Sequence, residues 1–307
     1  MAPRIRRDAS PMTSIPLPTD FDVRELMSFL QPRAVPAIER VSDRGYARSL
    51  RLDGRSVSVS LASETTRAGR RHLTTRSNPA LAPHRIRRLA RRLLDLDTEL
   101  AVFRRQVGRD PMLGPLVAIR PGLRLTCYLD PFEGTVRAIL GQQVSLAAAR
   151  TMTDRLVRLV GAPAPTVDDI GLLAFPPPES ILTVGVAGLR GIGLTGAKAA
   201  ALVAVSDAVL RGHLDWRWLR RATPEATQTR LESVRGIGPW TAAYVRMRAL
   251  GDRDAFLPTD LGIVKAFARL AGPAAARSPE RILARAEPWR PWRAYATLHL
   301  WRSLAES

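Results

Sequence analysis

Residues 231 to 260 read LESVRGIGPWTAAYVRMRALGDRDAFLPTD, and this stretch sets the fold expected for the chain. Apolar residues recur at helical spacing on both sides of Gly236-Ile237-Gly238-Pro239, and proline is tolerated only near the start of a helix. The stretch therefore predicts a helix-hairpin-helix. Its two glycines allow positive φ and close backbone approach, and the amides that open the second helix form a site for an anion such as a phosphate.

Length and charge set the class of the protein. The 307 residues are enough for two domains with separate cores. The formal net charge of +19 favours a polyanionic partner, most simply nucleic acid. A second explanation stays open, because the only lysines are Lys198 and Lys265 and a GC-rich genome would also enrich arginine.

Other residue types exclude several classes of site. The single cysteine, Cys127, excludes an internal disulfide, a multi-cysteine zinc site and a cysteine-held iron-sulfur cluster, and a cytoplasmic protein is expected. No run approaches the ~18 apolar residues of a membrane span. The histidines lack partners at metal-ligand spacing, so no catalytic metal is expected. Residues 1–18 are basic without a following apolar segment, and we expect a disordered arm.

Residues 19–108 predict a small α+β domain. Helical spacing runs over Val23–Leu30, and alternating runs on either side of Asp53-Gly54 predict a β-hairpin. Pro83–Leu94 predicts an amphipathic helix whose arginines form either a solvated face or a contact for DNA. Residues 109–130 contain several prolines and predict a linker of short pieces.

From residue 131 to 307 the strand signals stop, and the pattern predicts an all-helical domain. Helices are expected over Phe132–Leu140, Leu146–Val160, Ser180–Val186, Gly196–Leu210, Leu261–Leu270 and Pro279–Ala286, with a last one ending at Trp301.

The helical domain contains a short internal repeat, which we call the internal echo. The spacing of Leu189–Gly193 and the following alanines repeats that of Val234–Gly238 and the residues after it. Only the later copy continues into Pro239-Trp240-Thr241. We therefore assign the phosphate contact to the later turn and a packing role to the earlier one.

Asp260 stands at the expected start of the helix after the hairpin. An N-cap is a common role for aspartate. A helix-hairpin-helix alone is a weak functional signal, because many proteins use it to hold duplex backbone without reading sequence. From these two features alone the capping interpretation is favoured.

Further motifs occur in order along nearly the whole chain. They are Gly45–Leu50, Pro121–Leu125, Phe132-Glu133, Val136–Ser145, Phe256–Asp260, Pro291–Ala296 and His299–Trp301. Together with the hairpin they resemble the helix-hairpin-helix DNA glycosylases, and within them the 3-methyladenine DNA glycosylase II (AlkA-type) branch. The resemblance implies an N-terminal α+β domain like half of the TATA-binding-protein fold, followed by an all-helical domain that flips a base out of DNA.

The resemblance also implies the roles of the reacting groups. Asp260 would stabilise the oxocarbenium ion that forms on the sugar and would orient the attacking water. Trp240, Tyr244 and Trp301 would form a pocket in which an electron-poor base stacks on aromatic rings. From spacing alone, a core position is favoured for Trp240 and Tyr244, and the resemblance shifts the expectation to the pocket.

The remaining roles concern DNA. Gln143 is expected to be the wedge that fills the gap left by the flipped base, where the best-known member of the family has leucine. The amides expected to hold a phosphate lie around Gly236, Gly238 and Thr241. The carbonyls expected to hold a monovalent cation, Na⁺ or K⁺, are those of Glu232, Val234 and Ile237. No other cofactor is expected.

Trp240 also bears on the reaction. In lyase-active relatives a lysine occupies its place and forms a Schiff base with the sugar. Neither Lys198 nor Lys265 matches that place, so we expect a monofunctional enzyme without lyase activity. The resemblance implies that it hydrolyses the N-glycosidic bond of alkylated bases, such as 3-methyladenine and 7-methylguanine, in double-stranded DNA. We also expect a monomer. The alternatives are a glycosylase for oxidised, mismatched or deaminated bases, and a non-catalytic damage-binding protein.

Overall fold

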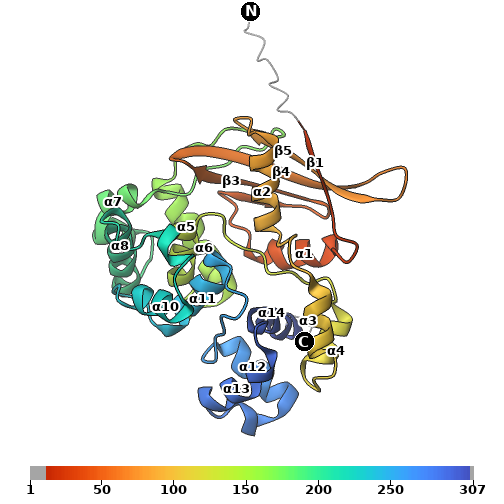
Figure 1. Cartoon of the computed structure of the whole chain (residues 1–307). Helices are drawn as coiled ribbons and strands as arrows, with labels where there is room; N and C mark the ends of the chain where they lie inside the picture. Colours follow the sequence, from red (N-terminus) through yellow and green to blue (C-terminus); the bar gives the residue numbers. More distant parts are fainter. Residues whose placement is uncertain (1–11, 305–307) are drawn as a thin grey trace, which may run out of the picture.

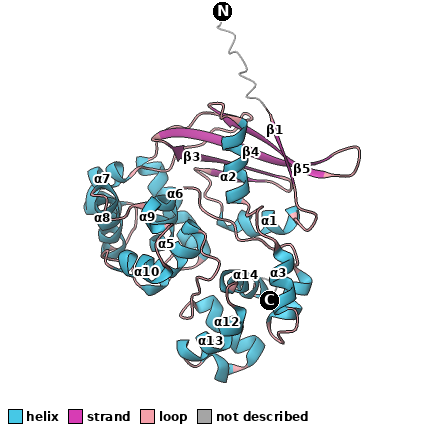
Figure 2. Cartoon of the chain, in the orientation of Figure 1, coloured by secondary structure: helices cyan, strands magenta, loops and turns pink. Residues whose placement is uncertain are grey.

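The computed structural model describes residues 12–304, and it combines one sheet with many helices (Figure 1). The strands are β1 (Thr13–Pro16), β2 (Glu39–Val41), β3 (Gly45–Leu52), β4 (Arg55–Thr65) and β5 (Arg71–Asn78). They pair antiparallel in the order β1-β5-β4-β3-β2. Figure 2 shows the strands gathered in one layer and the helices around and below it. The α+β class is confirmed.

The helices occupy both halves of the chain. Those before residue 131 are α1 (Val23–Leu30), α2 (Pro83–Leu93), α3 (Leu100–Val107) and α4 (Leu113–Ile119). Those after it are α5 (Pro131–Leu140), α6 (Leu146–Val160), α7 (Pro178–Gly191), α8 (Gly196–Leu210), α9 (Trp216–Leu219), α10 (Pro224–Glu232), α11 (Pro239–Val245), α12 (Leu261–Ala271), α13 (Pro279–Ala286) and α14 (Arg293–Ser303). A π-helical turn, η2 (Arg246–Leu250), continues α11.

The predicted β-hairpin is confirmed. Asp53 and Gly54, with φ of 50° and 77°, connect β3 to β4. Positive φ at both positions of a two-residue turn matches the natural twist of paired strands, and Asp and Gly tolerate it. The helix predicted over Val23–Leu30 is also confirmed, and the Asp22 carboxylate caps it by accepting a hydrogen bond from the Glu25 amide.

The predicted disordered arm is wrong for its last residues. Residues 1–11 lie outside the described part of the chain, but Thr13–Pro16 forms the edge strand β1 against β5. Ile15 is buried in the core beneath the sheet. A four-residue strand flanked by prolines carries too short an alternation to be recognised, because its order comes from pairing with a strand far along the chain.

The predicted linker of residues 109–130 is likewise more ordered than expected. It contains α4, whose Leu113, Leu116 and Val117 are buried. This helix packs against α3 and α14, so the segment belongs to a core that also includes the C-terminal helix. The prolines mark the ends of short elements and carry no information about burial.

A buried ionic network joins the sheet to α5. Arg48 of β3 lies 2.5 Å from the Glu133 carboxylate, and Arg137 lies 3.1 Å from the other oxygen of Glu133 and 3.0 Å from Glu39. All four side chains are at most 9% exposed. Glu39 also accepts a hydrogen bond from the Tyr46 hydroxyl. Buried charges require such pairing, so these bonds fix how the two domains meet.

The internal echo appears in the fold as two helix-turn-helix units, α7–α8 and α10–α11. Their turns contain glycines of nearly equal conformation, Gly193 with φ of 91° and Gly236 with φ of 90°. The first helix of the earlier unit is longer than predicted. It runs from Pro178 to Gly191 with a break at Gly185, where φ is 63° and ψ is −177°.

Candidate active site

Asp260 is the N-cap of α12, and its carboxylate accepts hydrogen bonds from the helix and from two side chains outside it. Oδ1 accepts a hydrogen bond from the Ile263 amide at 3.0 Å. The same oxygen accepts the indole N–H of Trp301 at 2.8 Å, and Oδ2 accepts the indole N–H of Trp240 at 3.0 Å. These donors fix the orientation of the carboxylate.

The three aromatic residues predicted for the base pocket lie together beside this carboxylate. Trp240 and Tyr244 are stacked, with ring centroids 5.3 Å apart and an interplanar angle of 24°. The Trp301 ring lies 6.3 Å from that of Tyr244. All three are half-buried. They therefore pack against the core and still present surface to a cavity.

That cavity is a cleft of about 1310 Å³ whose walls come from both domains. Asp260 and the three aromatic residues line it, as does Gln143. The N-terminal domain contributes Arg33, and Tyr128 lies on the segment that leads into α5. A cleft that combines aromatic walls with a few fixed polar groups is the usual form of a small-molecule or base pocket.

Arg33 and Tyr128 were missed by the sequence interpretation. Burial, with a hydrogen bond to Tyr244, raises the pKa of the Tyr128 hydroxyl well above its usual range. Burial also acts to raise the pKa of the Tyr244 hydroxyl, but Arg248, the bond to Tyr128 and Arg33 outweigh it and lower that pKa. Contacts between such distant segments leave no local signal that could have identified these residues.

Gly262 is a further residue that the sequence interpretation did not single out. A Cβ atom at this position would lie 3.0 Å from the Asp260 Oδ1 and 3.0 Å from the Trp301 ring. The absence of a side chain therefore allows the indole to approach the carboxylate. A glycine in the first turn of a helix is the signal that could have indicated this close approach.

Gln143 stands at the cleft in the turn between α5 and α6. It is exposed, and its backbone adopts φ of 54°, an uncommon conformation for a residue with a side chain. Val144 and Leu146, which follow it closely, are 41% and 45% exposed. The loop thus offers side chains to the solvent at the place predicted for the wedge.

The hairpin glycines differ in what requires them. Gly236 has positive φ, and a Cβ atom there would lie 2.2 Å from the Cβ of Ala201 on α8. Gly238 has φ of −95°, and no atom lies within 4 Å of its Cβ position. Thr241 is 2% exposed, and its hydroxyl accepts a hydrogen bond from Gln142. Because its side chain is buried, the phosphate contact is expected from backbone amides.

The three carbonyls predicted for a cation lie in and beside this turn. That of Val234 accepts a hydrogen bond from the Ile237 amide at 3.0 Å. A carbonyl oxygen has a second lone pair, and hard monovalent cations prefer neutral or anionic oxygen ligands, so the donor set suits Na⁺ or K⁺. Within residues 12–304, no group of three or more His, Cys, Asp or Glu side chains is placed to hold a metal ion.

Neither lysine stands in the place just after the hairpin, although Lys198 lines the cleft. Lys265 is exposed on α12. Lys198 of α8 is buried, burial lowers its pKa, and its ammonium donates to the Leu140 carbonyl at 2.8 Å. His299, interpreted as packing, lies in the core against Phe103, and burial together with Arg120 lowers its pKa to about 3.

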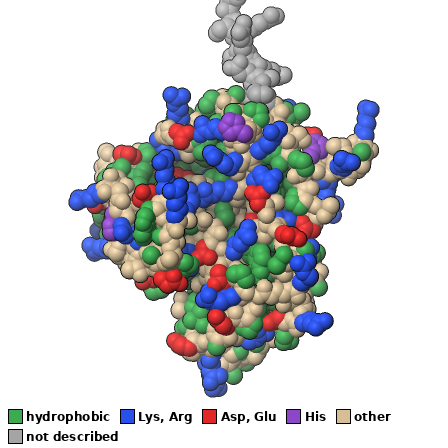
Figure 3. Space-filling view, in the orientation of Figure 1, with side chains coloured by type: hydrophobic (Ala, Val, Ile, Leu, Met, Phe, Trp, Pro, Cys, Tyr) green, Lys and Arg blue, Asp and Glu red, His purple; other side chains and the backbone are tan. Residues whose placement is uncertain are grey.

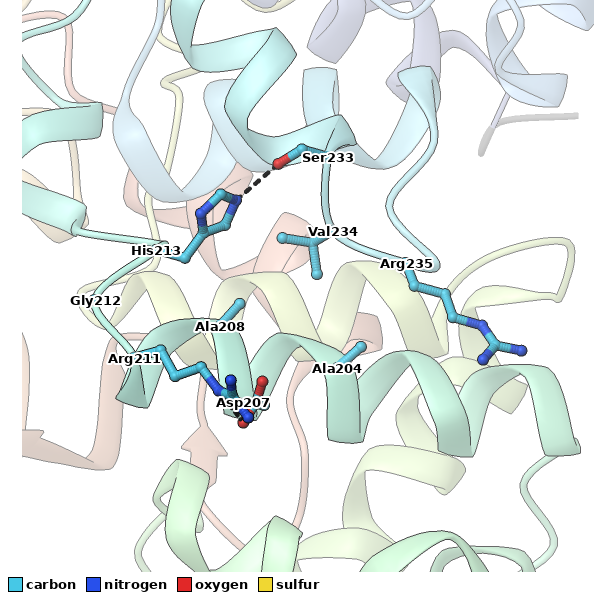
Figure 4. A pocket seen from close by; sticks show the side chains of 9 residues that line it. All are labelled: Ala204, Asp207, Ala208, Arg211, Gly212, His213, Ser233, Val234 and Arg235. Atoms are coloured by element: carbon cyan, nitrogen blue, oxygen red, sulfur yellow. Dashed lines mark hydrogen bonds and ion pairs between the residues drawn. The ribbon is translucent and has the colours of Figure 1, made fainter.

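A second hollow of about 560 Å³ lies between α8 and the hairpin (Figure 4). The His213 ring points toward Ser233, with 2.8 Å between Nε2 and the hydroxyl oxygen. Asp207 and Arg211 form an exposed ion pair on its other side. This hollow holds no aromatic pocket and no carboxylate beyond that pair, so the larger cleft is the candidate active site.

Two family models match the chain over most of its length. The AlkA N-terminal domain matches residues 13–130, and the HhH-GPD superfamily of base excision DNA repair proteins matches residues 136–291. The chain belongs to the HhH-GPD superfamily. The AlkA N-terminal match begins at β1 and includes α4, the two segments that were expected to be an arm and a linker.

Individual relatives agree with this membership. The DNA-3-methyladenine glycosylase 2 of Escherichia coli is 35% identical over 92% of this chain and 93% of its own length. The structure of a 3-methyladenine DNA-glycosylase from Archaeoglobus fulgidus superposes with a TM-score of 0.82, at 26% identity over 94% of this chain and 96% of that one. A probable bifunctional transcriptional activator/DNA repair enzyme AlkA of Mycobacterium tuberculosis is 35% identical over 94% of this chain but only 56% of its own length. This HhH-GPD chain is accordingly a DNA repair glycosylase.

Proposed function

We propose that this glycosylase removes alkylated bases, such as 3-methyladenine and 7-methylguanine, from double-stranded DNA by hydrolysis alone. The observation that carries the proposal is the Asp260 carboxylate, held by two indole N–H groups at the wall of an aromatic cleft. Relatives that carry 3-methyladenine glycosylase names align over nearly the whole chain.

In this proposal the flipped base enters the aromatic cleft. An N-alkylated purine is cationic, and its electron-poor ring is attracted to indole and phenol faces by ~0.5 to 2 kcal/mol per favourable contact. The bond between C1′ and the base nitrogen breaks, and its electron pair moves onto the base, which leaves neutral. The Asp260 carboxylate stabilises the positive charge on the sugar. A water molecule then attacks C1′, and its proton passes to a general base or to solvent.

The hairpin and the wedge loop would hold the DNA in place. The amides around Gly236, Gly238 and Thr241 would bind a backbone phosphate at the start of α11, and a monovalent cation on the Glu232, Val234 and Ile237 carbonyls would add positive charge nearby. Gln143 would fill the gap that the flipped base leaves. Figure 3 shows basic side chains spread over much of one face of the molecule, which suits a partner as negatively charged as DNA.

The absence of lyase chemistry is proposed from the position of the amines. Trp240 occupies the place just after the hairpin, and the Lys198 ammonium is engaged with the Leu140 carbonyl. Incubation with substrate DNA and borohydride should therefore trap no protein-DNA adduct, and the strand should remain uncut until alkali is added. A trapped adduct would contradict this part of the proposal.

The oligomeric state, the location and the fold of the N-terminal domain belong to the same proposal. The chain acts as a monomer, because both walls of the cleft come from one chain. Its location is the cytoplasm. The five-stranded sheet with α1 and α2 corresponds to half of a TATA-binding-protein fold. No helix within residues 12–304 is long and apolar enough to cross a membrane.

The test is base release from methylated DNA. Duplex DNA treated with a methylating agent carries both 3-methyladenine and 7-methylguanine, and chromatography of the ethanol-soluble fraction separates the two free bases. We expect release of at least one of them, with an intact abasic strand as the other product. Release of neither base, alongside release of an oxidised or deaminated base from matched duplexes, would assign the cleft to a different lesion.

A further inference from the structure

The loop that carries the predicted wedge has little support of its own. Residues 141–145 connect α5 to α6, and Gln143, Val144 and Ser145 within it are exposed. The positive φ of Gln143 has an energetic cost of order 1–3 kcal/mol for a residue with a side chain, so surrounding contacts must maintain it. Those contacts come from the two hairpin units on either side.

The later hairpin holds the loop through Gln142. The side-chain amide nitrogen of Gln142 donates to the Gly236 carbonyl at 2.9 Å and to the Thr241 hydroxyl at 2.7 Å. An amide NH₂ group has two hydrogens, so both are used in these bonds. Gln142, the residue immediately before the wedge, is thus bonded both to the hairpin turn and to the first turn of α11.

The earlier hairpin unit supports the same loop from below. Lys198 of α8 binds the Leu140 carbonyl at the end of α5, immediately before the loop. One turn further along α8, Ala201 is the residue against which Gly236 packs. Residues three apart lie on one face of a helix. One face of α8 therefore supports both the base of the wedge loop and the hairpin turn.

We propose that Gln142 is a positioning residue for base flipping. It couples the phosphate-binding hairpin to the wedge, so that binding of the DNA backbone at the hairpin places Gln143 in the duplex. This inference rests on the proposed function. Gln142 acts through its neighbour and the hairpin and need not contact the damaged base. A displacement of the hairpin turn is transmitted to the loop by two hydrogen bonds, whereas a loop without them would move independently.

The experiment compares Gln142→Ala and Gln142→Glu with Gln143→Ala. Each is measured for affinity to an undamaged duplex, for fluorescence of a 2-aminopurine placed opposite the wedge, and for single-turnover release of 7-methylguanine. We expect Gln142→Ala to bind undamaged DNA within about twofold of wild type, because the hairpin amides remain, and to release base about tenfold more slowly with less 2-aminopurine signal. Gln142→Glu keeps the size but only accepts hydrogen bonds, so it should lose at least as much.

A double-mutant cycle separates positioning from general weakening. All rates are measured well below the melting temperature of each variant. If Gln142 acts through the wedge, the Gln142→Ala/Gln143→Ala protein should release base no more slowly than Gln143→Ala alone. Multiplied effects, or wild-type rates for both Gln142 variants, would overturn the inference. Failure of the wild-type enzyme to release any methylated base would instead count against the proposed function.

Discussion

At the scale of single residues, the position of Asp260 is compatible with both roles that the sequence presented as alternatives. Its position predicted a helix cap, and the family resemblance predicted a catalytic carboxylate. The structure shows the cap, and it shows that both carboxylate oxygens also accept indole N–H groups from the cleft. The residues could be predicted from motifs, but these bonds could not, because Trp240 and Trp301 stand 20 and 41 residues from Asp260 in the chain.

The indole of Trp301 offers a test of this arrangement. Trp301→Phe keeps an aromatic ring for stacking but removes one donor to the Asp260 carboxylate. A hydrogen bond to a charged group contributes about 1.5 to 3 kcal/mol, so we expect single-turnover base release to slow about 10- to 100-fold. Trp218→Phe, at an exposed indole on α9, is the matched control and should keep the wild-type rate. An unchanged rate in Trp301→Phe would refute a role for this bond.

At the scale of elements, the two glycines of the hairpin differ in whether the structure requires glycine. Gly236 combines positive φ with contact against Ala201, whereas Gly238 is extended and open. Sequence reasoning treated the pair alike, because the packing partner on α8 lies far from the turn in the chain.

The glycines therefore predict an asymmetric pair of variants. Gly236→Ala should lower the free energy of unfolding by about 1 to 3 kcal/mol, because the new methyl overlaps Ala201 and the backbone is strained. Gly238→Ala meets no neighbour and should change it by less than about 0.5 kcal/mol. Urea unfolding followed by circular dichroism measures both, and equal losses in the two variants would contradict the assignment.

The cap of α5 predicts a pH effect. Asp130 accepts the Phe132 amide at 2.8 Å, and burial together with Glu133 raises its pKa from 3.8 to about 6. Between these pH values the folded chain binds more protons at this group than the unfolded chain, so its contribution to stability is lost as pH rises through about 6. Asn also caps a helix but does not titrate. Relative to wild type, Asp130→Asn should therefore gain stability from pH 4 to pH 7.5 in thermal melts. A constant difference over that range would contradict the raised pKa.

At the scale of the whole molecule, local pattern predicted most helices and the β3–β4 hairpin, and the bounds of α1, α6, α8 and α13 are as expected. Capping residues and apolar spacing act within one element, so they are visible in the sequence. The edge strand β1 and the helix α4 were missed, because each is ordered by partners distant in the chain. The cleft was predicted in its residues but not in the share contributed by the N-terminal domain through Arg33.

The ionic network between the domains predicts a large effect from one carboxylate. Glu133→Ala would leave Arg48, which is 1% exposed, with Glu39 at 3.9 Å as its remaining carboxylate and the Ser49 carbonyl at 3.0 Å. Removing one partner of a buried ion pair costs about 3 to 5 kcal/mol, measurable by chemical denaturation. Glu64→Ala removes a half-exposed partner of His72 and should cost less than about 1 kcal/mol. Similar losses for the two variants would show that the network does not hold the domains together.

The measurement that tests the central claim most directly is the single-turnover release of methylated bases by Asp260→Asn. The side-chain carbonyl of asparagine can still cap α12 and accept the Trp301 indole N–H, and only the hydrogen bond from Trp240 is lost. The variant should therefore fold and should still bind an abasic-site duplex. Because the negative charge that stabilises the oxocarbenium ion is gone, we expect the rate to fall about 100-fold or more. A variant that folds, binds DNA and releases 3-methyladenine and 7-methylguanine at the wild-type rate would contradict the account.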